Sequence, residues 1–136
     1  LGEFCALGES FKFLADKTGN DKARLLGEGV EAATQGYLDN DNSPQRKPGQ
    51  PDNRNSHYWF ARYWADALAA QAEDAGLAAH FAPVAKALAE KEDAIMAELM
   101  ADRGKPVDLG GYYLTDPAKI AAIMRPSGTF NAIIDG

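Results

Sequence analysis

The sequence is poor in the residues and motifs from which catalytic sites are usually built. It has one cysteine, Cys5, and two histidines, His57 and His80. A single cysteine excludes an intramolecular disulfide and is typical of a reducing cytoplasm. The histidines lie far apart and in no metal-ligand spacing, and no nucleophile elbow, Walker motif or glycine-rich dinucleotide fingerprint occurs. We therefore expect neither a complete catalytic site nor a metal site within these residues.

Long apolar runs and an excess of positive charge are also absent. No apolar run approaches the roughly 18 residues that can span a bilayer. The 14 lysines and arginines are outnumbered by 20 aspartates and glutamates, so the net charge is −6. Such a surface repels nucleic acid backbones and anionic membranes, so we expect neither as a general partner. The length of 136 residues and the hydrophobic fraction of 46% are typical of one globular domain.

Helical periodicity dominates the residues that are present. We predict a mainly α fold of about five helices, at residues 2–17, 21–38, 55–74, 77–102 and 117–124, with a last turn at 129–134. Pro83 should kink the fourth helix or start a new one. Gly27, Gly29 and Gly36 weaken the second helix, because each glycine costs helix stability relative to alanine. The short connection between the first two helices predicts that they are antiparallel neighbours.

Residues 107–114 break the helical pattern and predict an extended segment with one short strand. A lone strand needs a partner. No second strand is predicted, so the partner is expected in another chain or in sequence outside these 136 residues. The first helical pattern also starts at Leu1 without a capping residue. Both features indicate a piece of a longer chain. Within that first helix, the position of Cys5 predicts a small buried side chain.

The segment 39–53 has the composition of a loop, with three prolines and several Asn and Asp residues. Loops of this length in compact domains are usually functional or disordered. Its second half is net positive inside an acidic chain, with Arg46, Lys47 and Arg54 against Asp52. An arginine presents a planar fork of donors that matches phosphate oxygens, and the start of the next helix also favours an anion. The pattern predicts a phosphate-recognition loop.

A purely structural interpretation of this loop is open as well. Its two adjacent cations can be solvated, or they can pair with Asp39 or Asp41, and composition alone favours this alternative. Arg54 lies just before the cap of the next helix and is predicted to be structural, either paired with Asp52 or bound to backbone carbonyls. His57, in the first helical turn, is predicted to be a packed or capping histidine rather than a catalytic base.

Three long segments carry a family resemblance. They are LGEFCALGESFKFL (residues 1–14), SPQRKPGQPDNRNSHYWFARYWADALAAQAED (43–74) and GKPVDLGGYYLTDPAKIAAIMRPSGTFNA (104–132). In this order they resemble the C-terminal end of monomeric-type NADP-dependent isocitrate dehydrogenases, and the likeness extends over the whole chain. One departure is Asn55, where the family tends to carry glycine. Asparagine tolerates left-handed backbone, so a turn there is expected to survive.

The resemblance implies a cytoplasmic oxidoreductase of the tricarboxylic acid cycle and glyoxylate bypass. Such an enzyme oxidises isocitrate to 2-oxoglutarate and carbon dioxide, reduces NADP to NADPH, and uses Mg²⁺ or Mn²⁺. Residues 1–136 would then be a single C-terminal segment of the domain assembled from both chain ends, within an isocitrate/isopropylmalate dehydrogenase-like α/β fold. The isocitrate ligands, metal ligands and acid/base residues would lie outside this segment, so the segment alone would be inactive.

The resemblance also assigns one cofactor contact. The arginine of the family's Ser-Pro-x-Arg-Lys loop contacts the 2′-phosphate of NADP, and the matching residue is Arg46. Lys47 would add a neighbouring charge with a smaller role. This reverses the preference that composition alone gives for a structural loop.

A function of another class remains as an alternative. The chain would then be a stand-alone helical interaction module with an anion-binding loop, and the aromatic helix 58–64 would be its partner surface. Aromatic side chains fall on more than one side of this helix, which favours contacts on several faces. A piece cut from a larger enzyme would also be prone to self-association through apolar surface that the missing chain normally covers.

Overall fold

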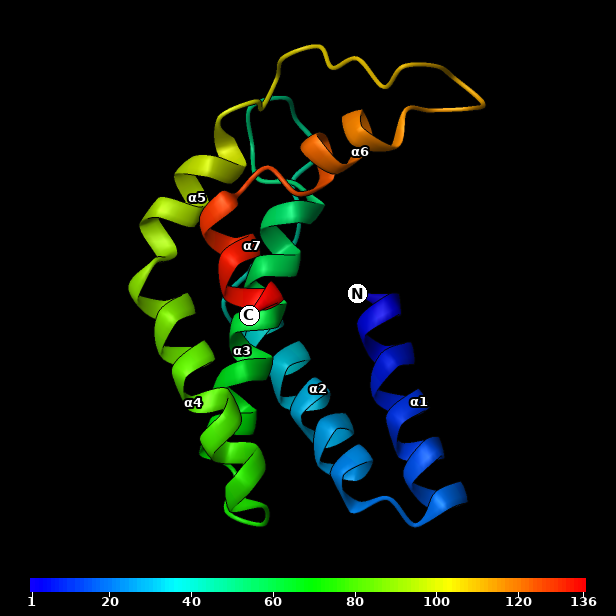
Figure 1. Ribbon diagram of the computed structural model, residues 1–136, viewed down its shortest axis with the longest axis vertical. Helices are drawn as coiled ribbons and strands as arrows, with labels where there is room; N and C mark the ends of the chain where they lie inside the picture. Colours follow the sequence, from blue (N-terminus) through cyan, green and yellow to red (C-terminus); the bar gives the residue numbers. More distant parts are fainter.

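Seven α-helices and no strands make up the computed structural model, which describes all 136 residues (Figure 1). In chain order they are α1 (Gly2–Thr18), α2 (Asp21–Asp39), α3 (Asn53–Ala70), α4 (Ala75–Glu90), α5 (Glu92–Met100), α6 (Pro117–Met124) and α7 (Gly128–Asp135). The mainly α prediction is confirmed. The predicted number of helices was too low because α4 and α5 were counted as one and α7 as a single turn.

The first two helices form an antiparallel pair, as their short connection predicted (Figure 1). Gly19 ends α1 with a left-handed backbone at φ 67°, and the side chain of Asn20 caps α2 by accepting from the backbone N–H of Ala23. The glycines of α2 allow close approach. A Cβ at Gly27 would lie 3.1 Å from the carbonyl oxygen of Gly8, and one at Gly29 would lie 3.0 Å from the Trp64 ring. The residues that weaken α2 locally therefore serve its packing.

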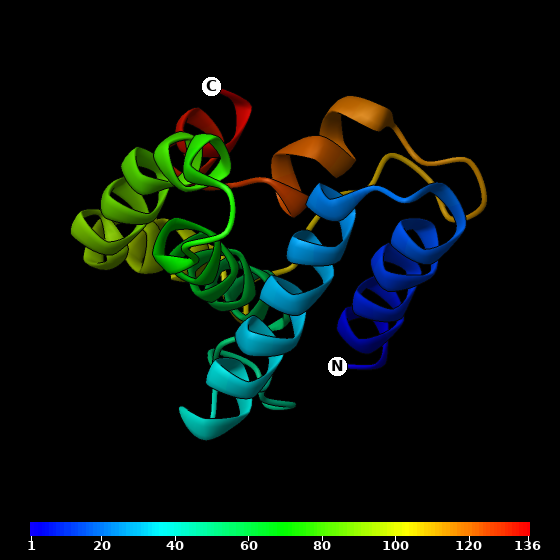
Figure 2. The same cartoon turned by 90° about the horizontal axis from the view of Figure 1, so that it is seen from below.

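Helix α3 lies between α2 and α4 (Figure 2) and contributes side chains to both clusters of the hydrophobic core. One core cluster joins α1, α2 and α3 and consists of Phe4, Val30, Ala33, Tyr37 and Phe60. The other joins α3, α4 and α5 and consists of Tyr58, Ala65, Ala85, Leu88, Ile95 and Leu99. The Phe4 and Phe60 rings stack with centroids 4.0 Å apart. The prediction that α3 is contacted on several faces is confirmed, and its aromatic side chains are largely used within the fold.

The segment predicted as one helix at 77–102 forms two helices, and the second of them does not start at Pro83. Pro83 lies inside α4, which continues through it, and the chain breaks instead at Lys91, between α4 and α5. Proline costs one helical hydrogen bond, but Phe81 and Val84 on either side of it pack against the α3–α5 core cluster. Tertiary packing therefore keeps the helix continuous at Pro83.

The strand predicted at 107–114 is also wrong. These residues are irregular and extend away from the helices (Figure 1). The segment is closed by a hydrogen bond from the backbone N–H of Asp116 to the carbonyl oxygen of Leu109, 2.8 Å, and no second extended segment lies beside it. Tyr112 and Tyr113 at its tip are 88% and 97% exposed. The segment is thus a projecting loop with an aromatic tip.

Two smaller expectations also change. Cys5 is exposed rather than buried, because α1 turns Phe4 instead toward α2 and α3. Asn55 lies in the first turn of α3 and not at a left-handed position. Its side chain accepts a hydrogen bond from the backbone N–H of Asp52 and completes a capping box. No helix is both long and apolar enough to cross a membrane.

The carboxylate of Glu98 in α5 binds the start of α7. This group accepts hydrogen bonds from the Ser127 hydroxyl at 2.6 Å and from the Thr129 hydroxyl at 2.6 Å and backbone N–H at 3.1 Å. Ser127 is buried and also caps α7 through the N–H of Phe130. These donors lower the pKa of Glu98 below its ordinary value of 4.5.

A pH-dependent contribution to stability follows from the lowered pKa of Glu98. Because the folded state favours the charged carboxylate, the contribution is complete above pH 4.5 and is lost as the pH falls through the lower folded-state value. We expect Glu98→Gln to have a lower melting temperature than wild type at pH 7. The difference in melting temperature between the two proteins should become smaller as the pH approaches 3. Thermal unfolding across this range measures it. An unchanged difference at every pH would contradict the assignment.

Candidate functional site

The candidate site is the loop between α2 and α3, residues 40–52, which we call the Arg46 loop. Its observed bounds agree with the predicted 39–53 within one residue at each end. The backbone N–H of Gln45 donates to the carbonyl oxygen of Pro51 at 2.8 Å and closes the base of the loop tip, residues 45–51. Within the tip, the N–H of Gln50 donates to the carbonyl oxygen of Lys47 at 3.2 Å. The loop therefore has a defined shape, with Arg46 at its exposed end.

Arg46 differs from every other arginine in the chain. The five others, Arg24, Arg54, Arg62, Arg103 and Arg125, each form an ion pair with at least one carboxylate. The Arg46 side chain is exposed and has neither an ion pair nor a hydrogen bond within the chain, and the same holds for Lys47. The alternative of pairing with Asp39 is not observed, since Asp39 accepts from Gln35 instead. Two free cations thus lie side by side at the loop tip.

Arg54 holds the base of the Arg46 loop to distant parts of the chain. Its Nη1 and Nη2 atoms donate to the two carboxylate oxygens of Asp102 at 2.9 and 2.8 Å, and its Nε donates to Asp52 at 3.0 Å. Nη1 also donates to the carbonyl oxygen of Ile123 at 2.7 Å. The side chain is only 9% exposed. The predicted structural role of Arg54 is confirmed, although the residue lies inside α3 rather than before its cap.

This arrangement favours the charged forms of both partners. The Arg54 hydrogen bonds lower the pKa of Asp102 below its ordinary value, and they raise the pKa of Arg54. Asp52 has a double role because it caps α3 and also accepts from Arg54 and Arg103. The network therefore joins the loop base to the end of α5 and, through Ile123, to α6.

Arg103 contacts the Arg46 loop directly and was missed from the sequence. Its Nε donates to the carbonyl oxygen of Gln50 at 2.7 Å, and its Nη1 donates to Asp52 at 2.7 Å. The next residue, Gly104, has φ +74° and lies against the loop, so that a Cβ there would be 3.4 Å from the backbone nitrogen of Gly49. The sequence holds no local signal for these contacts, because Arg103 and Gln50 are 53 residues apart.

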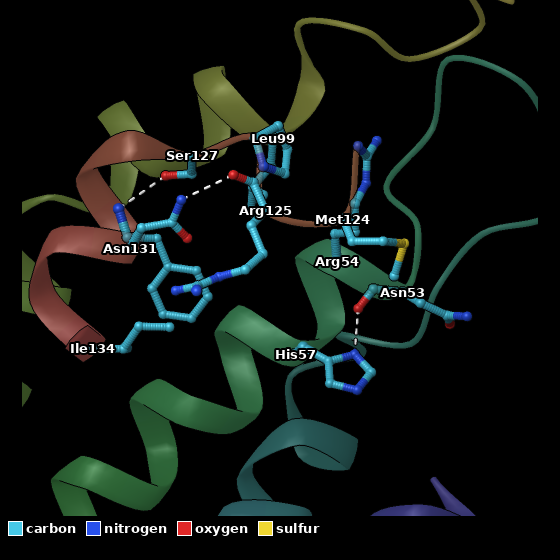
Figure 3. Close-up of a pocket in the computed structure, with 11 residues that line it drawn as sticks. Asn53, Arg54, His57, Leu99, Met124, Arg125, Ser127, Asn131 and Ile134 are labelled. Carbon is cyan, nitrogen blue, oxygen red and sulfur yellow. Dashed lines mark hydrogen bonds between the residues drawn. The ribbon is translucent and has the colours of Figure 1, made fainter. Parts of the chain in front are cut away.

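A pocket of about 210 Å³ opens beside this network, between the start of α3 and the α6–α7 junction (Figure 3). Its eleven lining residues include no aspartate or glutamate, so it offers no acid/base pair. His57 lies in its wall with Nδ1 2.6 Å from the carbonyl oxygen of Asn53 and its ring edge-on to Phe4. The His57 side chain is 54% exposed, so it contacts Phe4 at the surface and is not buried, and its bond to Asn53 stays within α3.

Comparison with known proteins identifies the family. Residues 1–135 match the family model described as monomeric isocitrate dehydrogenase. The chain belongs to the monomeric isocitrate dehydrogenase family. It is 52% identical over 135 residues to isocitrate dehydrogenase (NADP) 2 of Mycobacterium tuberculosis and 53% identical over 135 residues to isocitrate dehydrogenase (NADP) of Corynebacterium efficiens. It is 48% identical over 134 residues to isocitrate dehydrogenase (NADP) of Azotobacter vinelandii. The resemblance stated from the sequence is confirmed.

The match is complete for this chain but partial for its relatives. It covers 98–99% of the chain and 18% of each of these three isocitrate dehydrogenases. The chain's own residues also do not fit the Mg²⁺ or Mn²⁺ that the family resemblance implies, since no three His, Cys, Asp or Glu side chains gather into a group that could hold a metal ion. We therefore derive no metal-dependent step from these residues.

Proposed function

We propose that this chain is the C-terminal segment of an NADP-dependent isocitrate dehydrogenase. The whole enzyme would convert isocitrate to 2-oxoglutarate and carbon dioxide and form NADPH. The names of the relatives, which carry both isocitrate and NADP, support this proposal. The segment would provide helical scaffold and one cofactor contact, and it would have no dehydrogenase activity alone. The isocitrate ligands and the Mg²⁺ or Mn²⁺ ligands would come from the remaining four-fifths of the enzyme.

The proposed contact is between Arg46 and the 2′-phosphate of NADP. One observation carries it: Arg46 is the single arginine of the chain whose donor fork is not already occupied by a carboxylate. An exposed guanidinium with free donors can bind two phosphate oxygens at once. Lys47 would add a point charge beside it and strengthen the local potential. The net charge of −6 makes this pair of free cations more distinctive.

The interaction-module alternative has less support in the fold. Its proposed partner surface was the aromatic helix 58–64, but Tyr58 and Phe60 are buried, and Trp64 donates to the carbonyl oxygen of Leu26 at 3.1 Å. The helix therefore presents little of its aromatic surface to another protein. We retain the dehydrogenase proposal as the single candidate function.

Arg46→Ala tests the proposal in a full-length family enzyme that carries this sequence. We expect NADP affinity to fall by about ten- to a hundredfold, because a hydrogen bond to a charged group contributes roughly 1.5–3 kcal/mol. Isocitrate affinity should stay the same, because the variant removes only a cofactor contact. Equilibrium titration with NADPH, followed by its fluorescence, measures the dissociation constant directly.

Arg24→Ala is the matched control for this measurement. Arg24 is a partly exposed arginine, and it is paired with Glu28 and Glu73 on the surface of the chain. Its replacement should leave NADP affinity unchanged. Lys47→Ala should have a smaller effect than Arg46→Ala. An NADP affinity within about twofold of wild type for Arg46→Ala would disprove the proposed contact.

A further inference from the structure

We infer that Arg103 is a positioning residue for the cofactor phosphate, acting through Arg46 by holding the loop that carries it. The inference rests on the proposed contact between Arg46 and NADP. Arg103 itself binds at the base of the tip, since its Nε donates to Gln50 and its Nη1 donates to Asp52. Its effect on the cofactor would be indirect, and it would not be a ligand.

The first support is that the loop tip has almost no other attachment. Residues 45–49 of the tip are all exposed, and the neighbour of Arg103 in the chain, Gly104, lies against Gly49. Two of the tip's hydrogen bonds, Gln45 to Pro51 and Gln50 to Lys47, are internal to it. Arg103 is the only residue outside the Arg46 loop that hydrogen-bonds to the tip. Removal of this side chain would leave the tip free to move as a unit.

The second support is the chemistry of the contact. The Arg103 guanidinium binds two different acceptors at once, the backbone carbonyl of Gln50 through Nε and the Asp52 carboxylate through Nη1. A planar fork can do this with one side-chain conformation, whereas a lysine ammonium is a point charge without fixed donor directions. Asp52 is also the cap of α3 and accepts from Arg54. Arg103 therefore couples the tip to two helices, α3 and α5.

The expected consequence is a loss of preorganisation. A loop that is already ordered loses little conformational entropy when it binds a ligand, and a freed loop must lose more. A guanidinium also binds phosphate with directional hydrogen bonds, so displacement of the Arg46 backbone weakens the contact. The change should appear in cofactor affinity and not in isocitrate affinity. It should also depend on the presence of Arg46.

A double-mutant cycle in a full-length family enzyme carrying this sequence tests the inference. The four proteins are wild type, Arg46→Ala, Arg103→Met and the double variant, and the probe is NADPH in an equilibrium fluorescence titration. Arg103→Met should weaken NADPH binding by about three- to tenfold in the wild-type background, since ordering of side chains and loops costs affinity on this scale. In the Arg46→Ala background it should change the affinity by less than about twofold.

Two further proteins separate positioning from general damage. Arg103→Lys keeps the positive charge but loses the fork, and its NADPH affinity should lie between those of wild type and Arg103→Met. It also keeps the test available if the methionine variant does not fold. Arg24→Met makes the same change at a surface ion pair away from the loop and should leave NADPH affinity unchanged. Isocitrate affinity is the readout for intact folding in every variant.

The NADPH titrations distinguish failure of the inference from failure of the proposed contact. Unchanged NADPH affinity in Arg103→Met, with Arg46→Ala still impaired, overturns the inference and leaves the proposed contact intact. Equal losses from Arg103→Met in both backgrounds also overturn it, because Arg103 would then act independently of Arg46. Unchanged affinity in Arg46→Ala disproves the proposed contact itself, and the inference falls with it.

Discussion

Replacement of Arg54 by methionine is expected to lower the free energy of unfolding by about 3 kcal/mol. Removing one partner of a buried ion pair typically costs roughly 3–5 kcal/mol, because the other charge, here that of Asp102, is left without compensation, whereas Asp52 keeps Arg103. The lower end applies here because Asp52 and Asp102 keep 24% and 32% of their side-chain surface exposed. Denaturant unfolding of the 136-residue chain, followed by the fluorescence of Trp59 and Trp64, measures the change.

The Arg54 side chain is largely buried, so its loss should destabilise the fold more than the loss of an exposed ion pair would. Arg24→Met is the matched control, since Arg24 pairs with Glu28 and Glu73 in a setting where such pairs contribute at most about 1 kcal/mol. If both variants unfold at the same denaturant concentration, the Arg54 network does not stabilise the fold as described. If only Arg54→Met is destabilised, the ends of α3 and α5 are joined by this side chain.

Ile95→Ala is expected to cost about 3–4 kcal/mol. Ile95 has no exposed surface and lies in the core cluster that joins α3, α4 and α5. Truncation of a fully buried isoleucine removes its transfer free energy and leaves a cavity, which together cost roughly 2–5 kcal/mol. Denaturant unfolding of the chain measures this change in the free energy of unfolding.

Ile134→Ala is the control for the core substitution. It makes the same chemical change in α7, where the isoleucine is 47% exposed. Surface substitutions of this kind usually change stability by about 0.5 kcal/mol or less. Equal losses for the two variants would mean that α5 is not packed as the structure describes. A large difference would locate the stability of this half of the chain in the α3–α5 core.

Local sequence signals were sufficient for most of the fold. Asn20 and Asp116 cap α2 and α6 near the predicted starts, and α1 ends at Thr18, one residue beyond its predicted end, with Gly19 as its C-cap. Helical periodicity and capping act over a few residues, so they are readable without a structure. The bounds of the Arg46 loop followed from its proline and asparagine content for the same reason.

Features that depend on distant contacts were missed. Pro83 was expected to kink its helix or start a new one, and α4 continues through it with Phe81 and Val84 packed on the α3–α5 core. Cys5 was expected to be buried from its position in the first helix. It is exposed, because the packing of α1 places this residue outside the core. The segment 107–114 looked like a strand from its residues, but strand formation requires a neighbour that the chain does not provide.

The sequence by itself determined the family, the helical character and the candidate residue Arg46, through its Ser-Pro-x-Arg-Lys motif. Only the tertiary structure decided that Arg46 has free donors and that Arg103 holds its loop. Arg54 and Asp102 are 48 residues apart, and Arg103 and Gln50 are 53 apart. Such contacts form only when helices from different parts of the chain pack together. The type of a residue can therefore be read from sequence, whereas whether its charge is occupied or free is a property of the fold.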